Sequence, residues 1–249
     1  MADWLYGFHA VESALRNDPA HIDRVLIEAG RRDARMRDLE SLIAQVGCPV
    51  ETLAARDLER RCGSPRHQGI AAAYSPAPAL GEADLDSLLA ELREPPFLLV
   101  LDGVTDPHNL GACLRSAEAA GVHAVIAPRD RAAGLTPAAR KVAAGSAERL
   151  PFVQVTNLVR TLERLKTAGI WILGAAGEGA LSLYESRLAD GPLALVMGAE
   201  GSGLRRLTRE ACDELIRIPM AGTVESLNVS VATGVCLFEL RRRRQAAQA

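Results

Sequence analysis

The sequence predicts an α/β protein: a small N-terminal module, followed by a larger domain built on a mostly parallel sheet. From residue 97 onward, short and nearly continuous apolar segments alternate with helical segments, a pattern typical of parallel strands covered on both faces. Before residue 75, short helical and strand patterns mix, and a proline-bracketed acidic stretch separates the two regions. With 249 residues, 48% of them hydrophobic, the chain can form one large or two smaller cores.

The N-terminal module spans residues 1–75 and contains four predicted elements. A helix begins within residues 10–15, a strand follows at 24–28, and helical spacing of apolar residues covers 35–46. Gly47 is a good helix stop, and residues 69–74 form a second short strand. Residues 76–96 are predicted to be an interdomain linker, with loops at its proline-rich ends and one amphipathic helix in its middle.

The larger domain spans residues 97–249 and contains alternating elements. Its predicted strands are 97–101, 123–127, 152–155, 171–175, 193–197 and 215–219. The clearest helices between and after them are 110–120, 158–168 and 227–240. No repeat of fixed period interrupts this order.

Composition excludes several classes of protein. The net charge of −2 does not indicate a nucleic-acid binder, although nearly all basic residues are arginine, which suits phosphate and base stacking. Codon bias is the alternative explanation for the arginines. The five cysteines lack a C-x-x-C pair, so we expect reduced thiols and neither a disulfide framework nor a zinc site. Without a span of about 20 apolar residues or a signal peptide, we expect a cytoplasmic protein that does not contact membranes.

The first motif reads LDGVTDPHNLGACLRSA from residue 101, where a strand ends and a helix begins. Asn109 and Arg115 lie six positions apart, so we expect both to face one side of the helix start. The alternative is an Asn cap and a surface arginine. His108 is interpreted as a turn residue.

The second and third motifs also follow predicted strands. In GAEGSG at 198–203, glycines allow a ligand close to the backbone, and Glu200 is either functional or a solvated turn carboxylate. In the stretch from residue 218 to 236, Ser226 and Asn228 precede the last helix, with simple capping as the alternative. Small residues at 230 and 232–234 would let this helix pack closely on another element.

In this order the three motifs make residues 97–240 resemble the SpoU/TrmH family of the SPOUT superfamily, the S-adenosylmethionine-dependent RNA ribose 2'-O-methyltransferases. YGFHAVE at 6–12 and HQGI at 67–70 extend the resemblance to the N-terminal module, which looks like the L30e-like RNA-binding domain of these enzymes. The resemblance implies a deep C-terminal trefoil knot from about residue 193 onward, which forms the cofactor pocket and a homodimer interface. Topology rules alone would have argued against a knot.

The resemblance also implies a function and a site. Within the family, the chain is most similar to the bacterial enzymes that methylate a guanosine of 23S rRNA, in the peptidyl-transferase P-loop of the large subunit. The substrate would be free rRNA or a large-subunit assembly intermediate. The implied catalytic residues are Asn109, Arg115, Glu200, Ser226 and Asn228, and the implied S-adenosylmethionine contacts are Gly198, Ile218 and Leu227. No metal is expected, because the leaving group is a neutral thioether.

The general base is not decided by the resemblance. Arg115 is the family's favoured candidate, but the guanidinium pKa exceeds about 12. We therefore expect Arg115 to bind the target phosphate and orient the ribose, while Glu200 or Ser226 receives or relays the proton. Glu225 adds a negative charge beside the site that matches no known role.

Three other functions compete with this interpretation. A tRNA methyltransferase of the same family is one, and a non-catalytic RNA-binding or ribosome-assembly factor is another. A Rossmann-type enzyme would need a glycine-rich turn after its first strand, which is absent. We expect the run 241–244 to be a solvated tail. RNA is expected to contact some of these basic residues: Arg31, Arg32, Arg35, Arg37, Arg115, Arg129, Arg131, Arg140 and Lys141.

Overall fold

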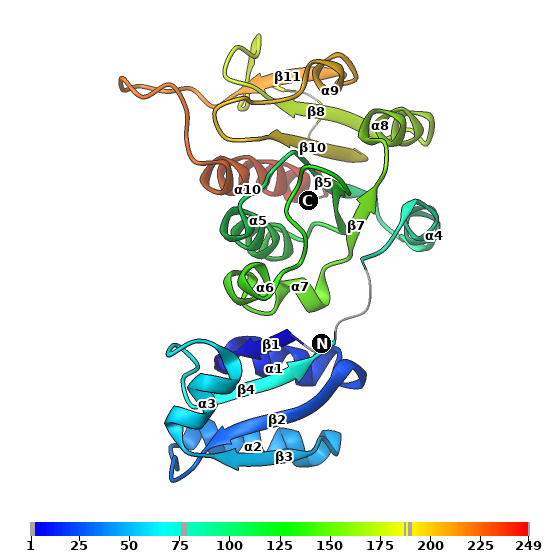
Figure 1. Ribbon diagram of the computed structural model, residues 1–249. Helices are drawn as coiled ribbons and strands as arrows, with labels where there is room; N and C mark the ends of the chain where they lie inside the picture. Colours follow the sequence, from blue (N-terminus) through cyan, green and yellow to red (C-terminus); the bar gives the residue numbers. More distant parts are fainter. Residues whose placement is uncertain (1–2, 76–78, 187, 189–190, 249) are drawn as a thin grey trace. The chain divides into compact units, whose positions relative to one another are not determined.

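The computed structural model describes residues 3–75, 79–186, 188 and 191–248, and these form two compact units (Figure 1). One unit combines Met1–Pro78 with Leu135–Arg149, and the other combines Ala79–Gly134 with Leu150–Ala249. The expected linker 76–96 therefore differs from the structure, since its residues from 79 onward belong to the second unit and residues 76–78 lie outside the described part. Residues 135–149, which we expected in the larger domain, cluster with the first unit.

The first unit is a four-stranded sheet with helices on both faces. Its strand order is β1-β4-β2-β3, with bounds Asp3–Tyr6, Ile70–Tyr74, Ile22–Glu28 and Val50–Leu53. Helices α1 (Phe8–Asn17) and α2 (Ala34–Val46) pack on one face, and α3 (Ala55–Cys62) packs on the other. The two predicted helices and two predicted strands are confirmed, whereas β1, β3 and α3 were not predicted.

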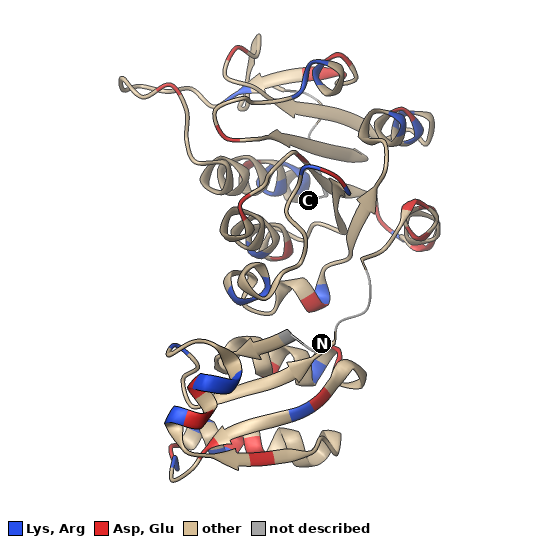
Figure 2. Cartoon of the chain, viewed as in Figure 1, with Lys and Arg blue, Asp and Glu red and all other residues tan. Residues whose placement is uncertain are grey.

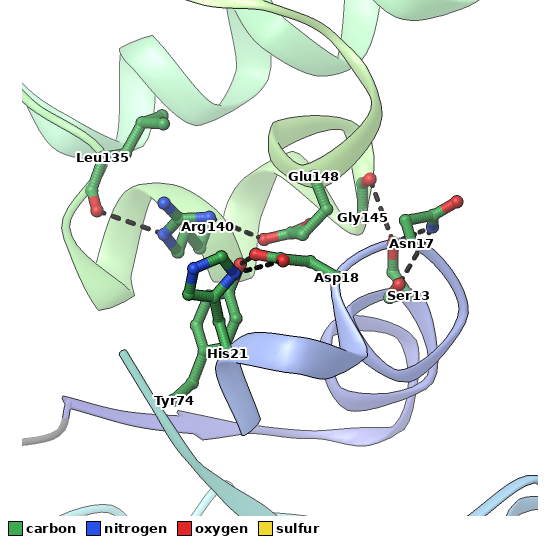
Figure 3. Close-up of polar contacts among 9 residues, drawn as sticks. All are labelled: Ser13, Asn17, Asp18, His21, Tyr74, Leu135, Arg140, Gly145 and Glu148. Carbon is green, nitrogen blue, oxygen red and sulfur yellow. Dashed lines mark hydrogen bonds and ion pairs between the residues drawn. The ribbon is translucent and has the colours of Figure 1, made fainter. Parts of the chain in front are cut away.

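Helices α6 (Pro137–Ala143) and α7 (Ser146–Arg149) complete the first unit through a buried polar cluster (Figure 3). Arg140 and Glu148 form an ion pair of 2.9 Å, and their side chains are only 6% and 1% exposed. The Arg140 guanidinium lies 5.2 Å from the centre of the Tyr74 ring, and the Tyr74 hydroxyl donates to Asp18 (2.5 Å). The expectation that RNA contacts Arg140 is therefore wrong, because Glu148 and Tyr74 hold this side chain in the interior.

The second unit is built on a seven-stranded sheet in which neighbouring strands run parallel. Its order is β7-β6-β5-β10-β8-β11-β9. The bounds are β5 Phe97–Asp102, β6 Ala124–Pro128, β7 Phe152–Val155, β8 Trp171–Ala175, β9 Leu181–Ser182, β10 Leu193–Gly198 and β11 Glu214–Arg217. All six predicted strands are confirmed. The late strand β10 lies between the earlier strands β5 and β8, an order compatible with the trefoil knot, which stays a prediction.

Helices cover both faces of this sheet, as its apolar strands require. On one face, the main core is enclosed by α4 (Glu82–Glu91), α8 (Leu158–Thr167) and α9 (Arg206–Glu210). On the other face, α5 (Pro107–Ala119) packs against α10 (Val229–Gln248). The expectation of a solvated tail at 241–244 is wrong for Arg244, which is 3% exposed and donates to the carbonyls of Pro95 (2.6 Å) and Gly191. Among the described residues, no helix has the length and apolarity needed to cross a bilayer.

Candidate active site

The candidate site lies at the carboxyl ends of the parallel strands in the second unit. Gly198 at the end of β10 is in register with Asp102 at the end of β5, and Met197 of β10 and Ile216 of β11 both pair with Ala175 of β8. Gly198 and Ile218 therefore leave the same edge of the sheet with only β8 between their strands, about 10 Å apart at the usual strand spacing. Ligands of open parallel sheets bind at this edge.

A tight turn connects β10 to the site. The backbones of Ala199 and Gly203 exchange hydrogen bonds of 3.1 and 2.9 Å, and Gly201 and Gly203 adopt positive φ angles of 75° and 64°. A Cβ atom on Gly198 would lie 2.2 Å from the carbonyl carbon of Gly203, so the turn closes only because residue 198 is glycine. The turn carries Glu200 at its exposed tip.

Three predicted site residues from separate motifs meet around one amide. The side-chain nitrogen of Asn228 donates to Asn109 Oδ1 (3.0 Å) and also to Glu200 Oε1. Glu200 Oε1 further accepts the backbone N–H of Val229 (3.4 Å) at the start of α10, where the helix dipole favours a carboxylate. Because Asn228 uses both of its amide hydrogens, it fixes the carboxylate relative to the first motif.

Asn228 is also the N-cap of α10. Its Oδ1 accepts the backbone N–H groups of Ser230 (2.9 Å) and Val231 (3.4 Å), so the capping alternative is correct for the oxygen of this side chain. Capping leaves the two donor contacts to Asn109 and Glu200 unexplained. The same residue therefore both starts the helix and organises the polar cluster.

Close packing of α5 on α10 buries Asn109, which is 8% exposed. The Cys113 thiol donates to Thr233 Oγ1 (3.5 Å), and Thr233 Oγ1 donates to the carbonyl of Val229 (2.7 Å). Burial raises the pKa of Cys113 to about 11, so this thiol stays protonated and serves packing. The predicted close approach of the small residues in the last helix is confirmed.

Arg115 and Ser226 do not join this cluster. Arg115 is exposed and, among the described residues, forms no hydrogen bond or ion pair. Six residues at about 100° each leave it roughly 120° from Asn109 around the helix, so the expectation that both face one side is wrong. Ser226 is exposed in the loop before α10, where Leu227 is half-buried.

Asp102 and Arg205, which form a contact in this region, were not among the predicted site residues. Asp102 is fully buried and accepts the backbone N–H of Arg205 at Oδ2 (2.8 Å), while its Oδ1 lies 3.4 Å from Arg205 Nε. This pair ties the end of β5 to the segment that follows the glycine turn. The available signal was an acidic residue that directly ends a buried apolar strand.

The chain offers suitable groups for a nucleoside-containing cofactor such as S-adenosylmethionine. The turn after Gly198 presents backbone polar groups with few side chains, because three of its six residues are glycine. The loop after Ile218 exposes the apolar side chains of Met220 and Val224. Apolar side chains together with a few backbone polar groups are the usual lining of ligand pockets.

We expect the Gly198→Ala variant to bind S-adenosylmethionine about 5- to 150-fold more weakly than the wild type. The added Cβ must push the backbone of Gly203 away, and over-packing of this kind typically costs about 1–3 kcal/mol. Isothermal titration measures the affinity. Gly177→Ala is the matched control, since a Cβ at Gly177 meets nothing within 4 Å. Equal affinities of both variants would contradict the role assigned to the turn.

Comparison with known proteins adds family matches over most of the chain. Residues 96–238 match the SpoU rRNA Methylase family, and residues 4–80 match the family described as RNA 2'-O ribose methyltransferase substrate binding. A protein of Photorhabdus laumondii is 55% identical over 244 residues, covering 98% of this chain and 99% of the relative. A protein of Escherichia coli K12 is 54% identical, covering 98% and 100%. Both are named 23S rRNA (guanosine-2'-O-)-methyltransferase RlmB.

Solved structures show the same fold. The SpoU methyltransferase AviRb from Streptomyces viridochromogenes, in complex with the cofactor AdoMet, superimposes with a TM-score of 0.80 at 26% identity, covering 98% of this chain and 90% of that one. A structure described as an RNA 2'-O ribose methyltransferase gives a TM-score of 0.77 at 25% identity, covering 98% and 88%.

Proposed function

This chain belongs to the SpoU rRNA methylase family, and on that basis we propose that it methylates the ribose 2'-hydroxyl of a guanosine in 23S rRNA, with S-adenosylmethionine as methyl donor. The observation that carries the proposal is similarity over the whole chain: relatives named for this reaction are 52–55% identical and cover 97–98% of it. The finer assignment, to the peptidyl-transferase P-loop, comes from the motif resemblance. A cytoplasmic location fits this substrate.

The chemistry requires a bound donor, a fixed ribose and an acceptor for its proton. When bound, S-adenosylmethionine supplies an electrophilic methyl group, and Gly198, Ile218 and Leu227 are the residues proposed to hold it. Fixing the ribose in line with that group lowers the barrier, because positioning alone can supply several kcal/mol. Asn109 is proposed to hold the ribose, since its amide N–H groups donate to no described residue.

Glu200 is the proposed proton acceptor. Its Oε1 accepts from Asn228 and Val229, whereas its Oε2 accepts from no described residue and so keeps its lone pairs for the 2'-hydroxyl or a bridging water. The contacts of Oε1 fix Glu200 in the polar cluster, which favours it over Ser226, an exposed side chain that does not join the cluster. A general base must lie within about 2.6–3.2 Å of the proton it takes.

The proposal includes a homodimer formed by the second unit. Helix α10 exposes Val231 and Phe238, which are seven residues apart and so share one helix face. Apolar side chains in such a stripe favour a covering partner. In a dimer, Arg115 reaches a site either from its own chain or from the partner. Sedimentation velocity measures the assembly state, and a monomer at working concentration would contradict it.

Arg115 is proposed to bind the target phosphate, so we expect Arg115→Lys to lower turnover on RNA by about tenfold or more. Lysine keeps the charge but loses the planar fork that binds phosphate bidentately. Steady-state methylation of an rRNA fragment measures the effect. Arg93→Lys, at an exposed arginine that follows α4, is the control. Near-normal turnover of Arg115→Lys would exclude a bidentate role.

Methyl transfer from labelled S-adenosylmethionine tests the function directly. We expect incorporation into a 23S rRNA fragment that contains the P-loop, and none into a fragment whose target guanosine carries a 2'-deoxyribose. Incorporation of labelled methyl groups into tRNA but not into rRNA would favour the alternative function, a tRNA methyltransferase of the same family. Cofactor binding without transfer to either RNA would favour a non-catalytic factor.

A further inference from the structure

Three loops of the first unit meet beside the ring of Phe8. The segment after β1 is fixed by hydrogen bonds from the N–H of Gly7 to Ile70 O (3.2 Å) and from the N–H of Phe8 to Gln68 Oε1 (3.2 Å). The loop after β2 joins them, because the N–H of Glu28 donates to Gly69 O (2.9 Å). The segments YGFHAVE and HQGI, which extend the family resemblance to this unit, therefore lie side by side.

Two arginines share the single aromatic ring at this junction. The guanidinium carbons of Arg31 and Arg35 lie 4.8 and 4.7 Å from the centre of the buried Phe8 ring. Like charges so close repel each other. Asp33 accepts from Arg31 Nε (2.6 Å), whereas Arg35 forms no ion pair with a described residue. Arg35 also contacts His9 Nε2 (3.0 Å), and both of these side chains are exposed.

The backbone is shaped to keep Arg31 in this place. Arg31 donates to the carbonyl of Gln68, and both Gln68 and Gly69 have positive φ angles, 56° and 76°. A Cβ on Gly69 would lie 2.8 Å from Arg31 Nη1. A left-handed, non-glycine residue costs about 1–3 kcal/mol and is retained mostly at functional sites. The strained loop holds a surface arginine against a ring, an arrangement that the packing of the core does not require.

We infer that Arg31 and Arg35, stacked on Phe8 and flanked by His9, form a phosphate-binding site for the RNA substrate on the first unit; this inference rests on the proposed function. Arginine forks bind phosphate oxygens bidentately, and stacking on a ring fixes the plane of each fork before the ligand arrives. A backbone phosphate of RNA would supply the anionic partner that Arg35 lacks among the described residues. The chain as a whole does not attract RNA, since its net charge is −2 and its basic residues are interleaved with acidic ones (Figure 2).

Binding of the full-length protein to a 23S rRNA P-loop hairpin tests the site. We expect Arg35→Gln to raise the Kd for the hairpin by about tenfold and to reduce the slope of log K against log salt by roughly 0.7, the effect of one lost phosphate contact in single-stranded RNA. Arg31→Gln is expected to act alike. In methylation assays the KM for RNA should rise while kcat and the affinity for S-adenosylmethionine stay unchanged.

Arg56→Gln is the matched control, because Arg56 is exposed on α3, on the opposite face of the same sheet, and the variant removes the same charge. We expect it to bind the hairpin within about twofold of the wild type. If Arg35→Gln and Arg31→Gln bind like Arg56→Gln, or bind weakly with an unchanged salt slope, the phosphate site is wrong. If the wild type itself neither binds nor methylates the hairpin, the proposed function fails instead, so the two failures are distinct.

Discussion

Replacing Asn228 by aspartate is expected to lower kcat/KM for RNA methylation by about 100-fold while leaving α10 intact. Aspartate caps helices as well as asparagine does. It cannot donate, however, so the contacts to Asn109 and Glu200 are lost and a second carboxylate faces Glu200. A hydrogen bond to a charged group contributes about 1.5–3 kcal/mol, and each 1.36 kcal/mol is tenfold in rate.

Two matched variants separate this role from capping. Asn228→Ser keeps a cap without adding charge, so its loss should be smaller than that of the aspartate variant. Ser230→Ala removes one contact to the Asn228 oxygen and is expected to keep activity within about threefold. Circular dichroism reports the helix. If all three variants methylated RNA equally well, Asn228 would be a cap and nothing more.

Replacing Arg140 by methionine is expected to destabilise the first unit by about 3–5 kcal/mol, the usual cost of removing one partner of a buried ion pair. Glu148 would keep a buried carboxylate without its cation, and its Oε2 already lacks a partner among the described residues. Urea unfolding measures the change. Arg140→Met combined with Glu148→Leu should recover most of the loss, because the pair is then replaced by apolar groups of similar size. No recovery in the double variant would contradict the pairing.

The loss of stability in the Arg140→Met variant is expected to depend on pH through Glu148. Burial raises the pKa of Glu148 above its ordinary 4.5, and Arg140 opposes that rise. A carboxyl whose folded pKa is raised stabilises the fold fully below its unfolded pKa, and this contribution is lost as pH rises through the folded pKa. Without Arg140 the pKa rises further. The stability gap between variant and wild type should therefore be smaller at pH 5 than at pH 8.

Local patterns in the sequence predicted the elements with strong apolar signals. The helix now defined as α2 ends at Gly47, whose φ of 74° is the left-handed conformation expected of a helix stop. In contrast, β3 and α3 are short and carry charged residues, so their sequences VETL and ARDLERRC gave little periodic signal. Instead, pairing with β2 stabilises β3, and burial of Leu58 in the core stabilises α3.

Buried charges were the main failure of the sequence interpretation. Arg140 and Arg244 lie in stretches that resemble solvated basic faces, yet each stacks on an aromatic ring and donates to interior acceptors. The Tyr74 ring lies far from Arg140 in the sequence, as Pro95 does from Arg244, so no local pattern indicates these partners. The meeting of Asn109, Glu200 and Asn228 was foreseen only through the motif resemblance, because the strand order that joins them is not readable from periodicity.

The most direct test of the account is a map of ribose methylation in 23S rRNA from cells with and without this protein. We predict that one guanosine of the peptidyl-transferase P-loop loses its 2'-O-methyl group in its absence and regains it from the wild-type gene but not from the Asn228→Asp variant. An unchanged 23S rRNA map, or methyl loss confined to tRNA, would contradict the account.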